Sequence, residues 1–256
     1  MKIWIINKRT AILAIAIAML CFTYAAYTKN ESITTAAKQK DLPIYCVDKG
    51  EEKIVSISFD AAWGNEDTEQ LIDILKTYDV KATFFVVGEW VDKYPESVKA
   101  LSDAGHEVMN HSNTHPHMTQ LSEEKMQQEL VECNKKIESV TGIKPILFRA
   151  PYGDYNDKVV QTIRENGCYT IQWDVDSLDW KDLSAEEITK RVTSKVKPGS
   201  IVLFHNAAKN TPAALPAILE KLQSDGYSIV PISNLIYADN YEIDNTGKQH
   251  LKNNPS

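Results

Sequence analysis

Ionisable side chains follow five apolar segments of this sequence, each at the point where the segment ends. They are Asp60 after SISF, His111 after HEVMN, Arg149 after PILF, Asp174, Asp176 and Asp179 after YTIQW, and His205 after SIVLF. A carboxylate such as Asp60 would emerge from the core into a site, and an imidazole such as His205 could give a proton to a leaving group. The structural alternatives are a helix or turn cap for Asp60 and a satisfied core position for His205.

A pair of histidines forms a candidate metal site. His111 and His115 lie four residues apart in HSNTH, a spacing that places two imidazoles on one side of a helical turn. Neutral ring nitrogens in that arrangement can bind one cation, and zinc suits them best. The alternative is two surface histidines, but the position directly after an apolar segment favours the metal site. His117 in HPH is expected at the surface or the rim.

The segment RAPYG offers a turn that could stabilise negative charge. It begins at Arg149, and Pro151 and Gly153 predict a tight turn. Such a turn could direct the backbone N–H of Tyr152 at a developing oxyanion. The alternative role of Arg149 is a structural ion pair with an aspartate at a strand end.

Seven segments rich in Ile, Val, Phe and Tyr predict the β-strands that must position these side chains. They are residues 53–59, 82–88, 106–110, 145–148, 169–173, 200–204 and 227–230. Residues 67–78 and a segment that begins at Ser122 have apolar residues at helical spacing. This alternation predicts a parallel sheet with helices outside it. Because ionisable groups from five strands would meet at one face, we expect a barrel, incomplete with seven strands, rather than an open doubly wound sheet.

Composition and charge exclude several classes of protein. The 28 Lys and Arg against 35 Asp and Glu give a net charge of −7, which argues against a nucleic-acid partner. The four cysteines contain no C-x-x-C pair, so the sequence supports neither a metal–thiolate cluster nor a redox motif. The sequence also lacks G-x-G-x-x-G and G-K-[ST], which argues against a nucleotide-binding α/β protein.

The first 27 residues resemble an export signal. An uncharged apolar run over residues 11–27 follows Lys2, Lys8 and Arg9. We expect an uncleaved single-pass signal anchor with the remainder outside the cytoplasm; the alternative is a cleaved peptide and a secreted protein. We further expect a polar linker over 28–52, one domain over 53–237 and a polar tail over 238–256.

Five short motifs in order carry a resemblance to a known family. FDAAWG (59–64), HSNTH (111–115), RAPYG (149–153), DSLDW (176–180) and LFH (203–205) resemble the motifs of the polysaccharide deacetylases, carbohydrate esterase family four, with its NodB homology domain. The resemblance covers residues 53–237 and is closest to the membrane-anchored sporulation and cell-wall branch. It implies a distorted (β/α)7 barrel.

The resemblance also implies a role for each matching residue. Those roles are Asp60 as catalytic base, His205 as general acid, His111 and His115 as metal ligands, Arg149 holding Asp60, Asp179 orienting His205, the Tyr152 amide in the oxyanion hole, and Trp180 and Leu203 lining an acetyl pocket. It implies a divalent metal, zinc or cobalt, and an N-acetylated cell-wall polysaccharide such as peptidoglycan as substrate. Amide hydrolysis needs an activated water, charge stabilisation for an oxyanion and a proton for the amine, and this set supplies each.

One position departs from the family pattern. The usual first motif has two adjacent aspartates, base and then metal ligand, whereas Ala61 follows Asp60 here. We expect Glu66 to complete the metal site, with Asp67, Asp176 or water as alternatives. Trp63 stands where small or turn residues are usual, and either narrows the site or packs on the rim.

The sequence is compatible with two functions of different classes. The first is a metal-dependent N-deacetylase of a cell-wall polysaccharide. The second is a catalytically silent glycan-binding or structural protein on the same fold, which Ala61 favours and the retained Asp60, His111, His115, Arg149 and His205 oppose.

Overall fold

The computed structural model describes residues 8–9, 16–21, 24 and 40–252. The chain divides into a unit of residues 1–39 and a compact unit that begins at Lys40. The described residues of the first unit have helical backbone, and most of the predicted signal anchor lies outside the described residues. Within the described part of the chain, no helix is both long and apolar enough to cross a bilayer.

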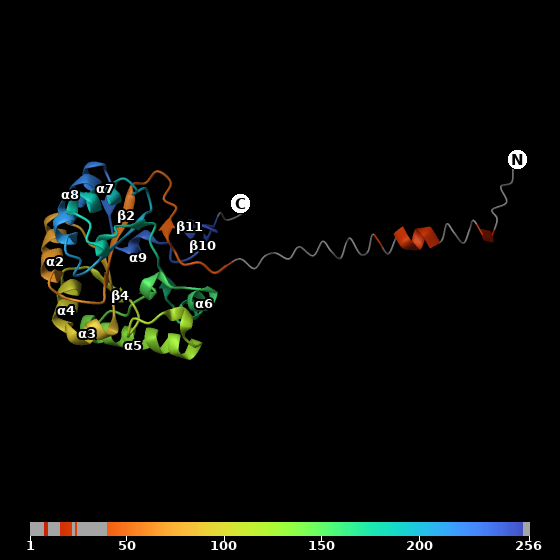
Figure 1. The fold of residues 1–256 in the computed structure, drawn as a ribbon, viewed down its shortest axis with the longest axis horizontal. Coiled ribbons are helices and arrows are strands. Elements are labelled where there is room, and N and C mark those ends of the chain that lie inside the picture. Colours follow the sequence, from red (N-terminus) through yellow and green to blue (C-terminus); the bar gives the residue numbers. More distant parts are fainter. Residues whose placement is uncertain (1–7, 10–15, 22–23, 25–39, 253–256) are drawn as a thin grey trace. The chain divides into compact units, whose positions relative to one another are not determined.

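A curled, parallel half-barrel sheet forms the centre of the compact unit (Figure 1). Its strands lie in the order β6-β5-β4-β3-β2-β8-β7, every neighbouring pair is parallel, and β9 pairs with β2. The bounds are β2 Ile54–Ala61, β3 Thr83–Val86, β4 Glu107–Asn110, β5 Leu147–Phe148, β6 Tyr169–Thr170, β7 Val175–Asp176, β8 Ile201–His205 and β9 Ser228–Ile229. All seven predicted strands are confirmed, although several are shorter than expected. The prediction missed only β7 in this sheet.

Helices surround the sheet, with β2, β4 and α9 inside the ring they form (Figure 1). They are α2 Thr68–Thr77, α3 Gly88–Lys93, α4 Pro95–Asp103, α5 Glu123–Thr141, α6 Asp157–Glu165, α7 Ala185–Thr193, α8 Thr211–Ser224 and α9 Ile232–Leu235. Three short 3₁₀ segments are Met118–Gln120, Pro151–Gly153 and Asp179–Lys181. The two predicted helices are confirmed as α2 and α5. Ser122 caps α5, because its side chain accepts a hydrogen bond from the backbone N–H of Lys125.

Both faces of the sheet are buried, which is typical of parallel sheets. Phe84 packs in an apolar cluster on the helix side, whereas the next residue, Phe85, packs in a second cluster inside the half-barrel. Side chains in β2 also alternate between the two faces of the sheet. Phe59 and Ala61 belong to the helix-side cluster. The side chain of Asp60, between them, therefore faces the interior of the half-barrel.

The predicted domain boundaries need correction at both ends. Residues 40–52, assigned to the linker, and 238–252, assigned to the tail, belong to the compact unit. The strand β1 (Cys46–Val47) pairs in parallel with β11 (Lys248–Leu251), which pairs antiparallel with β10 (Tyr241–Ile243). Ile44 and Val47 are fully buried in the inner cluster. The run IYCV is too short to show a period. It is buried by pairing with distant residues, Ile44 with Ile171 and Val47 with Gln249.

The segment 44–47 spans the gap between two strands of the sheet. The Ile44 N–H donates to the carbonyl of Thr170 in β6, and the Val47 N–H donates to the Gly199 carbonyl just before β8. Gly199 has φ of +81°, and a Cβ there would lie 1.7 Å from the Val47 carbonyl oxygen. Only glycine therefore allows this approach.

Replacing Gly199 with alanine tests whether this segment is part of the domain. We expect Gly199→Ala to lower the free energy of unfolding by about 3 kcal/mol or more, because it adds a clash to an unfavourable φ. Gly50→Ala is the matched control, since Gly50 has φ of +55° but no atom within 4 Å of a Cβ. It should cost only about 1 kcal/mol. Equal losses in urea denaturation would contradict the packing of this segment.

Candidate active site

The Arg149 guanidinium lies at the base of the site and is completely buried. It follows β5 and donates to Asp60 Oδ1 at 2.8 Å, to Ser58 Oγ at 2.9 Å and to the Gln172 carbonyl at 3.3 Å. Its Cζ atom lies 4.1 Å from the centre of the Phe85 ring. Arg149 thus joins β5 to β2 and to the residues after β6.

Asp60 is a buried carboxylate at the end of β2. Burial is the largest single effect and would raise the pKa of Asp60. The charge and hydrogen bond of Arg149, together with the nearby His111 and His205, outweigh burial and lower that pKa below its usual value. The carboxylate is therefore ionised at neutral pH. Its second oxygen, Oδ2, lies 3.6 Å from His111 Nε2.

The His111 imidazole is held in one tautomer by the backbone. Its Nδ1 lies 2.8 Å from the Arg149 carbonyl oxygen, which can only accept, so Nδ1 carries the proton and the Nε2 lone pair is available. Burial lowers the pKa of His111 despite the nearby Asp60 carboxylate, so the ring is neutral. A neutral imidazole whose other nitrogen donates to a backbone carbonyl is typical of a metal ligand.

His115 lies beside His111, but not on a helical turn as predicted. Residues 111–117 have irregular backbone, with left-handed φ values of +69° at Ser112 and +59° at His115. The Ser112 hydroxyl accepts a hydrogen bond from the His115 N–H and stabilises this turn. The ring centres of the two histidines are 5.0 Å apart. Burial lowers the pKa of His115 to about 4, and its Nδ1 is buried without a hydrogen-bond partner.

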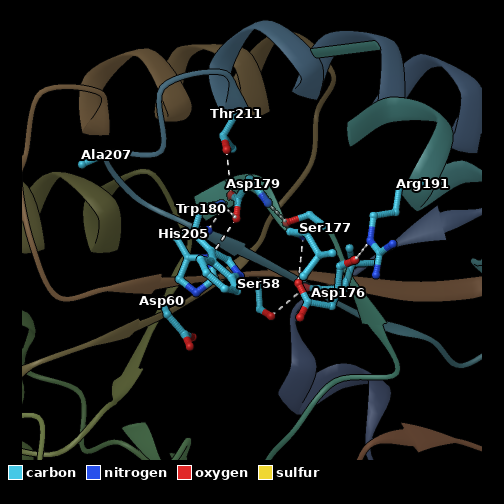
Figure 2. A network of polar contacts seen from close by, with 12 residues as sticks. Ser58, Asp60, Asp176, Ser177, Asp179, Trp180, Arg191, His205, Ala207 and Thr211 are labelled. Atoms are coloured by element: carbon cyan, nitrogen blue, oxygen red, sulfur yellow. Dashed lines mark hydrogen bonds and ion pairs between the residues drawn. The ribbon is translucent and has the colours of Figure 1, made fainter. Parts of the chain in front are cut away.

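His205 and Asp179 form a second polar pair, drawn in Figure 2. The His205 Nδ1–H donates to Asp179 Oδ1 at 2.8 Å. The backbone N–H of His205 and the Thr211 hydroxyl both donate to Asp179 Oδ2, so this buried carboxylate is fixed from three directions. No hydrogen bond among the described residues engages the Nε2 atom of His205, so this atom can donate or accept a proton.

The two polar pairs have opposite electrostatic character. Burial would lower the pKa of His205, but the hydrogen bond and charge of Asp179 raise it above 6.5. This pair therefore stabilises the fold fully below about pH 6.5, and loses that contribution as pH rises through the folded-state pKa. Between the lowered pKa of Asp60 and the raised pKa of His205, one group is an ionised base and the other a protonated acid.

The RAPYG turn has the predicted tight geometry. Tyr152 lies in the 3₁₀ segment Pro151–Gly153 with φ of +61°, an unfavourable backbone conformation for a tyrosine. Within the described residues, no hydrogen bond uses the Tyr152 N–H. A donor held in this way could stabilise an oxyanion in the adjacent cleft.

These residues meet in a cleft of about 650 Å³. The lining residues are Asp60, Ala62, Trp63, His111, His115, Tyr152, Gly153, Trp173, Asp176, Asp179, Trp180, Asp182, Leu203, His205, Asn206, Ala207, Ala208 and Lys209. Six of the eight predicted site residues are among them, together with Trp180 and Leu203. Arg149 lies buried behind Asp60, and Glu66 does not line the cleft.

The structure does not support Glu66 as the third metal ligand. Its side chain is exposed and turns back to accept a hydrogen bond from the Asn65 N–H. Asp67 accepts from the Ala207 N–H, and Asp176 accepts from the Leu178 N–H. Among the residues that the structure describes, no three His, Cys, Asp or Glu side chains gather closely enough to hold a metal ion. The two imidazoles fit a cation, but the described residues supply no third ligand.

Sequence reasoning missed Ser58 and Trp173. Ser58 accepts from Arg149, and its signal was a serine two residues before Asp60, on the same face of an otherwise apolar strand. Trp173 lines the cleft, and its ring centre lies 5.6 Å from Arg149 Cζ. Its signal was an aromatic residue at the end of the YTIQW segment.

The chain is similar to known proteins over most of its length. A family described as polysaccharide deacetylase matches residues 48–171. A peptidoglycan-N-acetylglucosamine deacetylase of Bacillus cereus is 37% identical over 190 residues, which cover 72% of this chain and 89% of that protein. The chain belongs to the polysaccharide deacetylase family. The uncharacterised protein YlxY of Bacillus subtilis is 33% identical over 196 residues, which cover 76% of this chain and 60% of that protein.

One of the solved structures that resemble this chain is described as a pseudoenzyme. A pseudoenzyme of the CE4 family from Bacillus anthracis matches with a TM-score of 0.73 and 36% identity, over 83% of this chain and 73% of that chain. The chain also spans 41% of the length of a Listeria monocytogenes deacetylase named PgdA.

The Arg149–Asp60 pair predicts a large effect on stability. We expect Arg149→Met to lower the free energy of unfolding by about 3–5 kcal/mol, because it leaves the Asp60 charge buried and unpaired. Methionine retains apolar contact with Phe85. The double variant Arg149→Met with Asp60→Asn should recover part of the loss. Urea denaturation measures both, and equal losses would show that the ion pair is not the source of the effect.

Proposed function

We propose that this protein is a hydrolase that removes N-acetyl groups from the amino sugars of a cell-wall polysaccharide. The observation that carries the proposal is the pairing of an ionised carboxylate, Asp60, with a carboxylate-supported imidazole, His205, in one cleft. Their opposite pKa shifts suit a general base and a general acid.

Several residues in and behind the cleft have a part in this reaction. Asp60 takes a proton from water as the water oxygen attacks the acetyl carbonyl carbon. The Tyr152 N–H donates to the resulting oxyanion. His205, protonated and held by Asp179, gives its Nε2 proton to the amide nitrogen as the C–N bond breaks. The products are acetic acid, which ionises to acetate, and the free amine. Return of the proton from Asp60 to His205 restores both groups, and Arg149 favours the ionised form of Asp60 before each attack.

The family implies a divalent metal, for which we propose zinc or cobalt held by His111 and His115. Both imidazoles are neutral, and the lone pair of His111 Nε2 is available. When bound, such an ion polarises a carbonyl and lowers the pKa of bound water. Water could complete its coordination in place of the carboxylate that Ala61 lacks.

Peptidoglycan is the proposed substrate. Several relatives are named as peptidoglycan-N-acetylglucosamine deacetylases, and one of them is matched over 89% of its length. A second relative, of Bacillus subtilis, is named a peptidoglycan-N-acetylmuramic acid deacetylase. The proposal therefore names the polymer and leaves the choice between its two sugars to the experiment.

The lack of a third metal ligand among the described residues favours a second function. Ala61 lies in the helix-side apolar cluster, and no third ligand joins the histidines among the described residues. A resembling chain is described as a CE4 family pseudoenzyme. The alternative is therefore a glycan-binding protein that keeps the cleft without turning over its ligand.

Metal content and acetate release of the full chain test the two functions together. After dialysis against zinc or cobalt, we expect near-stoichiometric metal and acetate release from N-acetylglucosamine oligomers or peptidoglycan. Asp60→Asn should retain the metal and lower the rate by about 10²-fold or more. The double variant His111→Ala with His115→Ala should lose both metal and activity.

His117→Ala is the matched control for the histidine pair. His117 is about half exposed, does not line the cleft, and has its Nδ1 3.4 Å from Asp154. This variant should keep its metal. A wild-type chain that binds the oligomers but holds no metal and releases no acetate would establish the alternative function.

We also propose that the chain is anchored in the cell membrane with its cleft outside the cytoplasm. The proposal rests on the basic residues Lys2, Lys8 and Arg9 before the apolar run 11–27. Protease added to intact cells should then digest the compact unit. Protection until the cells are lysed would contradict this location.

A further inference from the structure

Exposed aromatic side chains of the compact unit gather at one place. Among residues 40–252, the exposed aromatic residues are Trp63, Tyr152 and Trp180, at 65%, 58% and 57% of their full exposure. All three line the cleft, and they follow three different strands, β2, β5 and β7. An exposed apolar group costs free energy in water, so such a cluster marks a binding surface.

Trp63 is the member of this set that lies outside the two 3₁₀ segments used in the proposed reaction. Trp180 lies within the 3₁₀ segment that carries Asp179, and Tyr152 lies in the turn that presents its N–H to the cleft. Trp63 lies in the loop between β2 and α2, with its ring centre 4.7 Å from that of His115 at an interplanar angle of 69°. This edge-on contact leaves most of the indole exposed.

The loop that carries Trp63 is fixed by its neighbours. The Gly64 carbonyl accepts hydrogen bonds from the Trp90 indole N–H at 2.6 Å and from the Asn206 side-chain amide at 3.0 Å. Gly64 has φ of +64°, and a Cβ there would lie 2.5 Å from the Cβ of Ala207. The loop therefore packs directly against the residues that follow His205. Because the backbone is ordered by these contacts, the indole is presented to the cleft with little entropy left to lose on binding.

The chemistry of the exposed ring selects a ligand. The faces of a pyranose ring carry C–H groups, which pack well on the face of an aromatic ring, while the hydroxyl groups remain hydrated at the edge. The Trp63 ring contacts His115, but its loop carries neither Asp60 nor His205. A sugar stacked on this ring would therefore lie next to the sugar whose acetyl group reacts. We propose that Trp63 is a specificity-determining residue that stacks on the sugar next to the reacting one and makes the cleft select polymers over single sugars. This inference rests on the proposed function in taking the ligand to be an N-acetylated amino-sugar polymer.

Binding of N-acetylglucosamine and of its β-1,4-linked tetramer to the full chain tests this role. Calorimetry should show that Trp63→Ala weakens tetramer binding by about tenfold, an effect of the size expected for one aromatic contact. Binding of the single sugar should change by less than about twofold. Trp63→Phe retains a ring and should keep most of the affinity for the tetramer. Ile143→Ala removes an equally exposed apolar side chain outside the cleft and should bind as the wild type does.

Two results would overturn the role of Trp63. One is wild-type affinity of Trp63→Ala for the tetramer. The other is an equal loss of affinity for both ligands, which would mean that the indole acts on the reacting sugar or on His115. Acetate release measured on the same samples separates this inference from the proposed function. Tetramer binding that depends on Trp63 without acetate release would refute only the hydrolase, whereas acetate release with unchanged binding in Trp63→Ala would refute only the sugar contact.

Discussion

The buried charge of Arg149 is the constraint on which the rest of the site depends. A guanidinium with no exposure to water must find its hydrogen bonds inside the protein. It finds them on Asp60 and Ser58 of β2 and on the Gln172 carbonyl after β6. Its own carbonyl accepts from His111 after β4. One residue thus fixes the ends of several strands relative to one another, as well as the ionisation of Asp60 and the tautomer of His111.

The second pair, His205 and Asp179, is built on the opposite principle. Arg149 stabilises the unprotonated form of its partner, whereas Asp179 stabilises the protonated form of His205. The base and the acid of the two pairs lie on neighbouring strands, since Asp60 of β2 is in register with His205 of β8. An ionised base and a protonated acid can therefore coexist at one pH, which is the electrostatic basis of the proposed hydrolysis.

The alternation of side chains along β2 places Ala61 on the opposite face of the sheet from Asp60. Its side chain packs with Phe59 on the helix side, while Asp60 faces the interior. The nearby carboxylates of Glu66 and Asp67 are used by backbone N–H groups of their own surroundings. The loop that carries Glu66 instead presents Trp63 to the cleft, beside His115. The loop between β2 and α2 therefore supplies no metal ligand, and its Trp63 is the residue proposed to select the ligand.

The alternation of apolar strand segments with helical spacing determined the parallel sheet, because residue periodicity is a local property of the chain. The position of Asp60, His111, Arg149 and His205 after strands likewise determined that they meet, since parallel strands end at one edge. The backbone pairings that bury Ile44 and Val47 were decided only by the tertiary structure, because they join Ile44 to Ile171 and Val47 to Gln249, which are far away in the sequence. The direction of the Glu66 side chain was also decided only by the tertiary structure. Sequence distance placed it near the histidines, but a hydrogen bond within its own loop directs its carboxylate elsewhere.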